Sequence, residues 1–246
     1  MTDIVQMAVL NHSTLLGDTA IEPMIAAVEE YVAAQIGPHW DIAVALHQIP
    51  SGDPPPAGMW QTVFLDNSDQ ANDLGYHELT AEGLPLGRVF VATTQNCSQT
   101  VSRVFSHEVI EALVDPALNR TLPGPGAPYA IEVGDPLSLD SQGRMVQGQL
   151  MSGIALPAYY FPNYGTTYDL DGHLTGMIPT PAKEGGTFLM WQQDGMWQSQ
   201  MAARAPDEFM AMQANFGSRR HRRILGASRW RHSTAGKPTA SEVAIV

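Results

Sequence analysis

Apolar residues in the first 93 positions form short runs or alternate with polar residues in four segments, a pattern that predicts four strands. Between the first two segments, apolar residues recur at every third or fourth position. This spacing predicts a helix over residues 20–36 that ends at Gly37-Pro38. A polar, irregular stretch at 66–85 is expected to form a loop. The predicted strands are residues 3–11, 41–47, 59–65 and 88–93.

A second helix is predicted after the fourth strand, because apolar residues again recur at helical spacing and Pro116 closes the segment. Ser98 or Thr100 is its expected N-cap. Beyond residue 137, short apolar stretches alternate with turn residues. Among these, 186–192 and 196–200 are expected to pair as a hairpin around Asp194-Gly195.

The resulting fold class is α+β, with the order β-α-β-β-β-α in the first half. We expect a first half at 1–137 that carries a mixed sheet and the second helix. An irregular, β-rich half at 138–217 should pack on it and include a helix near 206–215. Residues 218–246 are expected to form a basic, flexible tail.

Charge is divided unevenly along the 246 residues. Residues 1–218 sum to −18 and residues 219–246 to +6, which together give the net charge of −12. An acidic body argues against general nucleic-acid binding. Only the tail, with arginines at 219–223, offers an electrostatic arm for nucleic acid, a membrane surface or an acidic partner. The alternative is a solvated tail that folds back on the acidic body.

Cysteine content and hydropathy indicate a cytoplasmic protein. The single cysteine, Cys97, can form neither an internal disulfide nor a thiolate zinc cluster. No apolar run approaches the length of a membrane span, and the N-terminus lacks the basic and apolar regions of a signal peptide. The oligomeric state has no signal in the sequence.

The second predicted helix carries an HExxE motif. The spacing from His107 to Glu111 places an imidazole and a carboxylate one helical turn apart on the same face, where both can bind a divalent metal ion. Glu108 lies between them, in position to take a proton from an attacking water. The alternative is an ordinary amphipathic helix whose two glutamates are solvated.

A third ligand is expected from the segment that follows a Pro/Gly-rich loop at 122–128. Glu132 is the first candidate, and Asp115 and Asp135 are its rivals. Asp115 or Asp135 could instead accept the second ring N–H of His107, since ligand histidines usually donate that proton to a carboxylate. His77, in the loop predicted at 66–85, is a candidate catalytic residue that could polarise a carbonyl; the alternative is a hydrogen-bonding loop histidine.

The chain resembles the zincin superfamily of metallopeptidases, and more closely a group of uncharacterised bacterial proteins with a zincin-like signature. The resemblance implies that the motif helix follows a mixed sheet whose edge strand binds an extended substrate. It also implies that His107, Glu111 and Glu132 are the ligands and that Glu108 is the general base. The matching segments are residues 64–69, 74–80, 83–91, 106–116 and 129–136.

Glu111 stands where zincins usually carry a second histidine, so the ligand set is harder and more anionic. We expect one divalent ion, with zinc first and manganese, iron or calcium as alternatives. The expected function is therefore metal-dependent hydrolysis of a peptide or protein substrate. The alternative is a non-catalytic protein whose metal ion stabilises the fold while it binds a partner.

Overall fold

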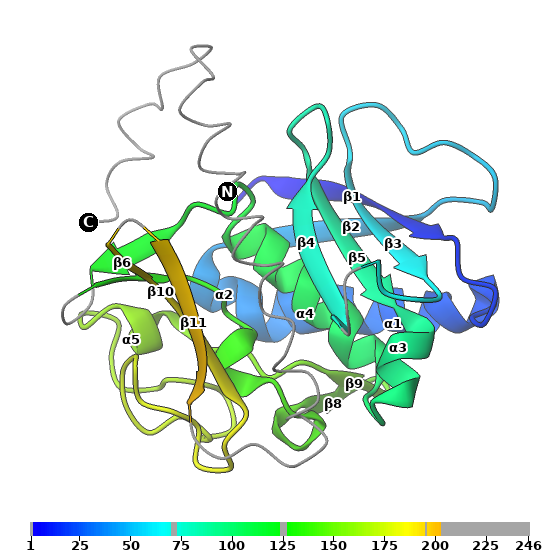
Figure 1. The fold of residues 1–246 in the computed structure, drawn as a ribbon. Coiled ribbons are helices and arrows are strands. Elements are labelled where there is room, and N and C mark those ends of the chain that lie inside the picture. Colours follow the sequence, from blue (N-terminus) through cyan, green and yellow to red (C-terminus); the bar gives the residue numbers. More distant parts are fainter. Residues whose placement is uncertain (1, 70–72, 124–126, 195, 203–246) are drawn as a thin grey trace.

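The computed structural model of the chain describes residues 2–69, 73–123, 127–194 and 196–202. These residues form an α+β fold with a five-stranded mixed sheet, a four-stranded sheet and a two-stranded hairpin (Figure 1). The described part of the chain contains no helix that is long and apolar enough to cross a membrane.

The five-stranded sheet contains the four strands predicted from the sequence and a fifth that was missed. Its strand order is β2-β1-β3-β5-β4. The first four strands in this order run parallel, and β4 pairs antiparallel with β5 at the edge. The strands are β1 (Ile4–Asn11), β2 (Ala43–Gln48), β3 (Trp60–Leu65), β4 (Gly75–Leu79) and β5 (Pro85–Phe90).

Strand β4 lies inside the stretch 66–85 that was predicted to be a loop, so that prediction was wrong. The strand is short, and its sequence Gly-Tyr-His-Glu-Leu mixes polar and apolar residues without a clear alternation. It forms because Leu79 pairs with Pro85 and Gly75 with Val89 across a tight turn. The fourth predicted strand is also displaced, since β5 ends at Phe90 and the chain then turns into the short helix α3 (Val91–Asn96).

The first helix is longer than predicted. Helix α1 (Asp18–Tyr31) continues through a π-helical turn, η1 (Val32–Ile36), into the short helix α2 (Gly37–Trp40). Pro38 does not end the helical path, because proline is tolerated in the first turn of a helix, where its missing N–H has no partner to lose. The path ends at Asp41, which has a left-handed φ of 54°.

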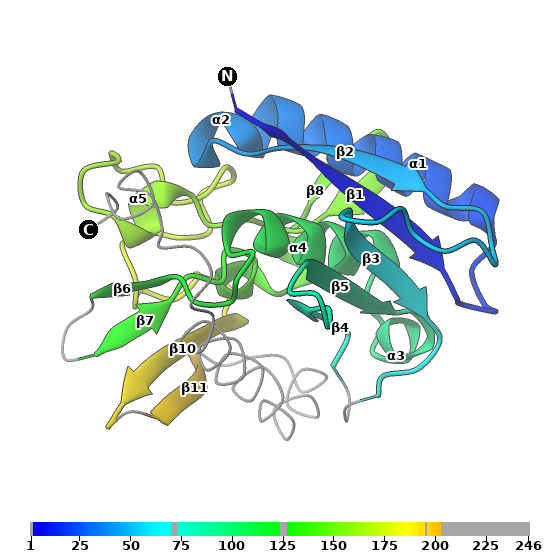
Figure 2. The ribbon, with the colours of Figure 1, turned by 90° about the horizontal axis from the view of Figure 1, so that it is seen from above.

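Helix α4 (Val101–Val114) carries the HExxE motif and is buried along its whole length. Thr100 precedes it in the N-cap position, although its side chain makes no capping bond. Figure 2 shows α1 and α4 on the same face of the five-stranded sheet, and α4 packs against β4, β5 and the hairpin strand β9. Phe105 on α4 meets Phe64 on β3 with ring centroids 5.1 Å apart.

The four-stranded sheet takes strands from both sides of residue 137. Its order is β11-β10-β7-β6, and the predicted hairpin at 186–200 is confirmed as β10 and β11. The helix predicted at 206–215 and the basic tail lie outside the described residues. The remaining elements are β6 (Thr121–Pro123), β7 (Pro128–Ala130), η2 (Asp135–Leu137), η3 (Asp140–Gln142), β8 (Arg144–Val146), β9 (Gln149–Met151), α5 (Pro157–Tyr160), β10 (Thr187–Gln193) and β11 (Met196–Ala202).

Candidate metal centre

Helix α4 places the three polar residues of its motif in the interior. His107, Glu108 and Glu111 have only 4%, 1% and 2% of their surface exposed. The alternative of an amphipathic helix with solvated glutamates is therefore wrong. Burying two carboxylates on one helix is costly unless groups of opposite charge or a metal ion lie beside them.

Asp135 and Glu111 both approach the ring of His107. The Nε2 atom of His107 lies 3.3 Å from Oε1 of Glu111 and 3.5 Å from Oδ1 of Asp135. Asp135 stands at the start of η2, which follows β7 and its short connecting loop. These three residues form a group whose potential ligand atoms all lie within 4.8 Å of one another, a suitable arrangement for a metal ion.

His77 comes to the same place from β4. Its Nδ1 atom lies 3.6 Å from Oε2 of Glu111 and 3.9 Å from Oε2 of Glu108. His77, Glu111 and Glu132 form a second group of potential ligands within 4.8 Å of one another. The side chain of His77 is therefore buried among carboxylates, on a strand and not in the loop expected from the sequence.

We call the residues of both groups, together with Glu108, the central cluster. Three separate segments supply it: β4, helix α4, and the loop after β7 together with the first residue of η2. All of its members are at least nine-tenths buried. The central cluster consists of His77, His107, Glu108, Glu111, Glu132 and Asp135.

Several polar atoms of the central cluster make no hydrogen bond within the described part of the chain. They include Nε2 of His77, Nε2 of His107 and Oε2 of Glu108, and each is buried. An unsatisfied buried polar atom costs about 1–3 kcal/mol, so several in one place call for an explanation. Imidazole nitrogens and carboxylate oxygens are common ligands of zinc and of harder divalent ions, so the donor set fits such an ion.

The charges of the cluster shift the pKa values of both histidines in the same direction. Burial lowers the pKa of His107, but the negative charge of Glu111 and the contact with Asp135 outweigh burial and raise this pKa to about 10. Burial likewise lowers the pKa of His77, whereas Glu108 and Glu111 raise it to about 10. Burial raises the pKa of Glu111, but the two histidines hold it well below its usual value. Without a metal ion, protons on the histidines thus compensate the carboxylates.

Ser152 determines which nitrogen of His107 faces the cluster. Its hydroxyl donates to the carbonyl of Gly153 over 3.0 Å, so its oxygen is left to accept a hydrogen bond from Nδ1 of His107 at 3.3 Å. With the proton on Nδ1, a neutral His107 carries its lone pair on Nε2, which is the atom beside Glu111 and Asp135. The sequence predicts a carboxylate in this supporting position, whereas the structure places the hydroxyl of Ser152 there.

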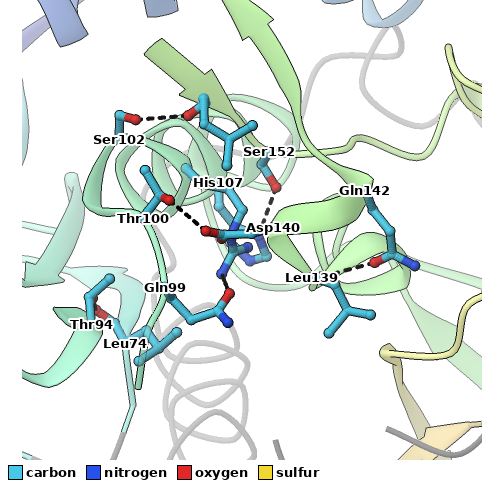
Figure 3. A network of polar contacts seen from close by, with 12 residues as sticks. Leu74, Thr94, Gln99, Thr100, Ser102, His107, Leu139, Asp140, Gln142 and Ser152 are labelled. Atoms are coloured by element: carbon cyan, nitrogen blue, oxygen red, sulfur yellow. Dashed lines mark hydrogen bonds and ion pairs between the residues drawn. The ribbon is translucent and has the colours of Figure 1, made fainter. Parts of the chain in front are cut away.

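A wider network holds Ser152 and α4 in register (Figure 3). The backbone N–H of Ser152 donates to Oγ of Ser106 over 2.8 Å, and the hydroxyl of Ser102 donates to the carbonyl of Leu150 over 2.9 Å. Asp140 accepts hydrogen bonds from Thr100 and from Nε of Arg103, at 2.6 Å for the arginine. These contacts attach the motif helix to the segment between η3 and Ser152.

Two glycines allow the segments to approach the motif helix. A Cβ atom on Gly134 would lie 2.3 Å from Nδ1 of His107, and one on Gly75 would lie 2.7 Å from Oε1 of Glu108. The backbone N–H of Gly134 also donates to Oε1 of Glu111 over 3.1 Å. Both glycines lie within the segments that resemble the zincin-like group, at 74–80 and 129–136.

Asp115 is buried outside both ligand groups. Its carboxylate accepts hydrogen bonds from the backbone N–H groups of Asn119 and Arg120 at 2.9–3.1 Å, which secures the turn after α4. Of the candidates for the third ligand, Glu132 and Asp135 therefore lie in the cluster, and Asp115 does not. Tyr160 supports Glu132 by donating its hydroxyl to the Glu132 carbonyl over 2.8 Å.

Comparison with known proteins assigns this chain to no family. No family model, curated protein or solved structure matches this chain. The described residues thus give an α+β protein with buried groups of histidine and carboxylate side chains that could hold a metal ion.

Proposed function

We propose that this protein is a metal-dependent hydrolase that cleaves peptide bonds and is related to the zincins. The observation that carries the proposal is the position of Glu108. It belongs to neither ligand group, yet its Oε2 atom lies 3.9 Å from His77 and makes no hydrogen bond within the described residues. A buried carboxylate next to a ligand set, and not within it, is suited to act as a general base.

The arrangement of the first half supports the relationship to zincins. Strands β1, β3 and β5 run parallel, the edge strand β4 runs antiparallel, and the motif helix packs directly on β4 and β5. A mixed sheet of this kind in front of an HExxE helix is what the resemblance implies. The substitution of Glu111 for the usual second histidine is accompanied here by His77 from β4, which places a second imidazole beside Glu111.

Each residue of the cluster has a role in the proposed reaction. A divalent ion bound here would supply Lewis acidity, which lowers the pKa of a water and polarises a carbonyl. Either His107, Glu111 and Asp135 or His77, Glu111 and Glu132 would hold the ion. Ser152 keeps the lone pair of His107 on Nε2. Glu108 takes the proton of the attacking water through its carboxylate and passes it to the leaving amine. The ion is expected to be zinc, with manganese, iron or calcium as alternatives.

The edge strand provides a means to align the substrate. β4 is the last strand in the order of the sheet and contributes His77 to the cluster, whereas β5 lies inside the sheet. An extended peptide can pair with a sheet edge through main-chain hydrogen bonds, with alternate side chains directed to either side. We therefore assign substrate alignment to β4, which lies in the stretch that precedes residues 88–93.

One observation favours a second candidate function. The members of the central cluster are 1–7% exposed, and buried structural ions typically have such surroundings. In this alternative, the ion joins β4, α4 and the loop at 131–134, and the protein acts by binding a partner through its acidic surface or its basic tail.

Replacement of Glu108 by glutamine separates the two functions. If the protein is a hydrolase, Glu108→Gln keeps its metal content and loses about 10²–10⁴-fold in the rate of cleavage of a peptide library, as expected for a general base. The matched control is Glu22→Gln, on the exposed surface of α1, which should leave the rate unchanged. Metal-loaded wild-type protein that cleaves no member of the library would support the binding function instead.

A further inference from the structure

The central cluster contains more potential ligands than one ion requires, and they fall into two groups. One group consists of His77, Glu111 and Glu132, and the other of His107, Glu111 and Asp135. Only Glu111 belongs to both. The two groups are therefore two potential ion positions that share one carboxylate.

The two oxygens of Glu111 face different histidines. Its Oε1 atom lies 3.3 Å from Nε2 of His107, and its Oε2 atom lies 3.6 Å from Nδ1 of His77. The backbone N–H of Gly134 donates to Oε1 and so fixes the orientation of the carboxylate. A carboxylate that presents one oxygen to each of two ligand groups is arranged as a bridging ligand.

We infer that the central cluster is a dinuclear metal centre in which Glu111 bridges two divalent ions. His77 and Glu132 complete one position, and His107 and Asp135 complete the other. This inference rests on the metal binding assumed in the proposed function, and it does not depend on hydrolysis of peptides. Ions that share a carboxylate in two-metal hydrolases lie about 3.5–4 Å apart.

The charges of the cluster agree with two ions. Its four carboxylates carry four negative charges when ionised, and two divalent ions carry four positive charges. One ion would leave a surplus of two negative charges among side chains that are at least nine-tenths buried, which is costly.

The two histidines approach Glu111 with different nitrogens. His107 presents Nε2, which is buried and makes no hydrogen bond among the described residues, and His77 presents Nδ1. A single ion bound by the group of one histidine would leave the buried carboxylates of the other group without a cation. Two ions provide a partner for the imidazole of each group.

Titration with Mn²⁺ tests the inference without any assay of hydrolysis. We expect two equivalents bound to the wild-type protein by elemental analysis after gel filtration, and an electron paramagnetic resonance spectrum of two exchange-coupled ions. His77→Ala and His107→Ala should each bind one equivalent and give the spectrum of an isolated ion. His47→Ala, on the exposed surface of β2, is the matched control and should bind two.

The possible outcomes distinguish this inference from the proposed function. One equivalent in the wild type, with an isolated-ion spectrum, would overturn the dinuclear centre and leave the proposed hydrolase with a single ion. No bound metal would overturn both. If a histidine variant does not fold, as judged by circular dichroism, the wild-type spectrum alone decides between coupled and isolated ions.

Discussion

At the scale of single residues, we expect Ser152 to raise the affinity of the centre for metal without being a ligand itself. Loss of its hydroxyl removes the acceptor for Nδ1 of His107 and allows the proton to move to Nε2, which then cannot bind an ion. Ser152→Ala should weaken metal binding about 10–100-fold. Competition with a fluorescent chelator measures this change, and an affinity equal to that of the wild type would contradict the proposed role.

Gly134 is expected to tolerate no side chain. Because a Cβ atom would lie 2.3 Å from the ring of His107, Gly134→Ala must displace either the ring or the loop. We expect a loss of about 1–3 kcal/mol in the free energy of unfolding together with weaker metal binding. Gly17→Ala is the matched control, since its Cβ would meet nothing closer than 4.0 Å. Equal stability of the two variants in urea would show that position 134 has room for a Cβ atom.

Metal binding should strengthen as the pH rises. The pKa values of His77 and His107 are raised from 6.5 to about 10, so their protons stabilise the metal-free fold fully below pH 6.5, and this stabilisation is lost as the pH rises towards 10. A metal ion must displace these protons, so its apparent affinity should rise by up to about tenfold per pH unit for each proton displaced within that window. Calorimetry in two buffers of different ionisation enthalpy counts the protons; an affinity independent of pH would contradict the assignment of histidine ligands.

At the scale of elements, we expect Asp115 to contribute to stability and Asp135 to contribute to metal affinity. Asp115 holds the turn after α4, so Asp115→Ala should cost about 1.5–3 kcal/mol of stability and leave metal affinity unchanged. Asp135→Asn should instead weaken metal binding with little loss of stability of the metal-free protein. Urea denaturation and metal titration of both variants check this contrast. A large loss of metal affinity in Asp115→Ala would show that Asp115 takes part in metal binding.

Elements with strong apolar patterns were predictable from the sequence, and those defined by pairing were not. The strands at β1 and β3 and the helix α4 were expected within a few residues of their observed bounds. Strand β4 was missed because its short sequence shows no clear alternation and is defined by its pairing with β5. Since His77 lies on β4, its position among the carboxylates was not predicted either.

The candidate site was predictable only where its residues lie close in sequence. The spacing of His107 and Glu111 follows from helix geometry. Glu132 was the first candidate for the third ligand because of its place after the Pro/Gly-rich loop, and the resemblance implies the same residue. The choice among Asp115, Asp135 and Glu132 required the path of the loop after β7, which nothing in the local pattern determines. Ser152 lies 45 residues from His107, and no local rule connects them.

At the scale of the whole molecule, a bound ion would join segments that are far apart in the chain. β4, α4 and the loop before η2 meet at the central cluster, and the ion would bind them together in the folded state alone. Metal at 100 times its dissociation constant should therefore add about 2.7 kcal/mol of stability.

This stabilisation can be measured as a shift in Tm. For a domain of this size, 2.7 kcal/mol corresponds to a rise of about 5–10 °C. Scanning calorimetry with and without metal should show the rise in the wild type and in His47→Ala, and a chelator should reverse it. A Tm that does not change on addition of zinc, manganese or calcium would argue that the three segments need no ion.

The most direct test of the account is the metal content of the purified protein, measured by elemental analysis beside His107→Ala and Glu111→Ala. We expect bound divalent metal in the wild type, a reduced content in His107→Ala, and the lowest content in Glu111→Ala, because Glu111 belongs to both ligand groups. Wild-type protein that holds no metal after dialysis against zinc, manganese or calcium would contradict the account, and the central cluster would then be a buried network of protonated histidines and carboxylates.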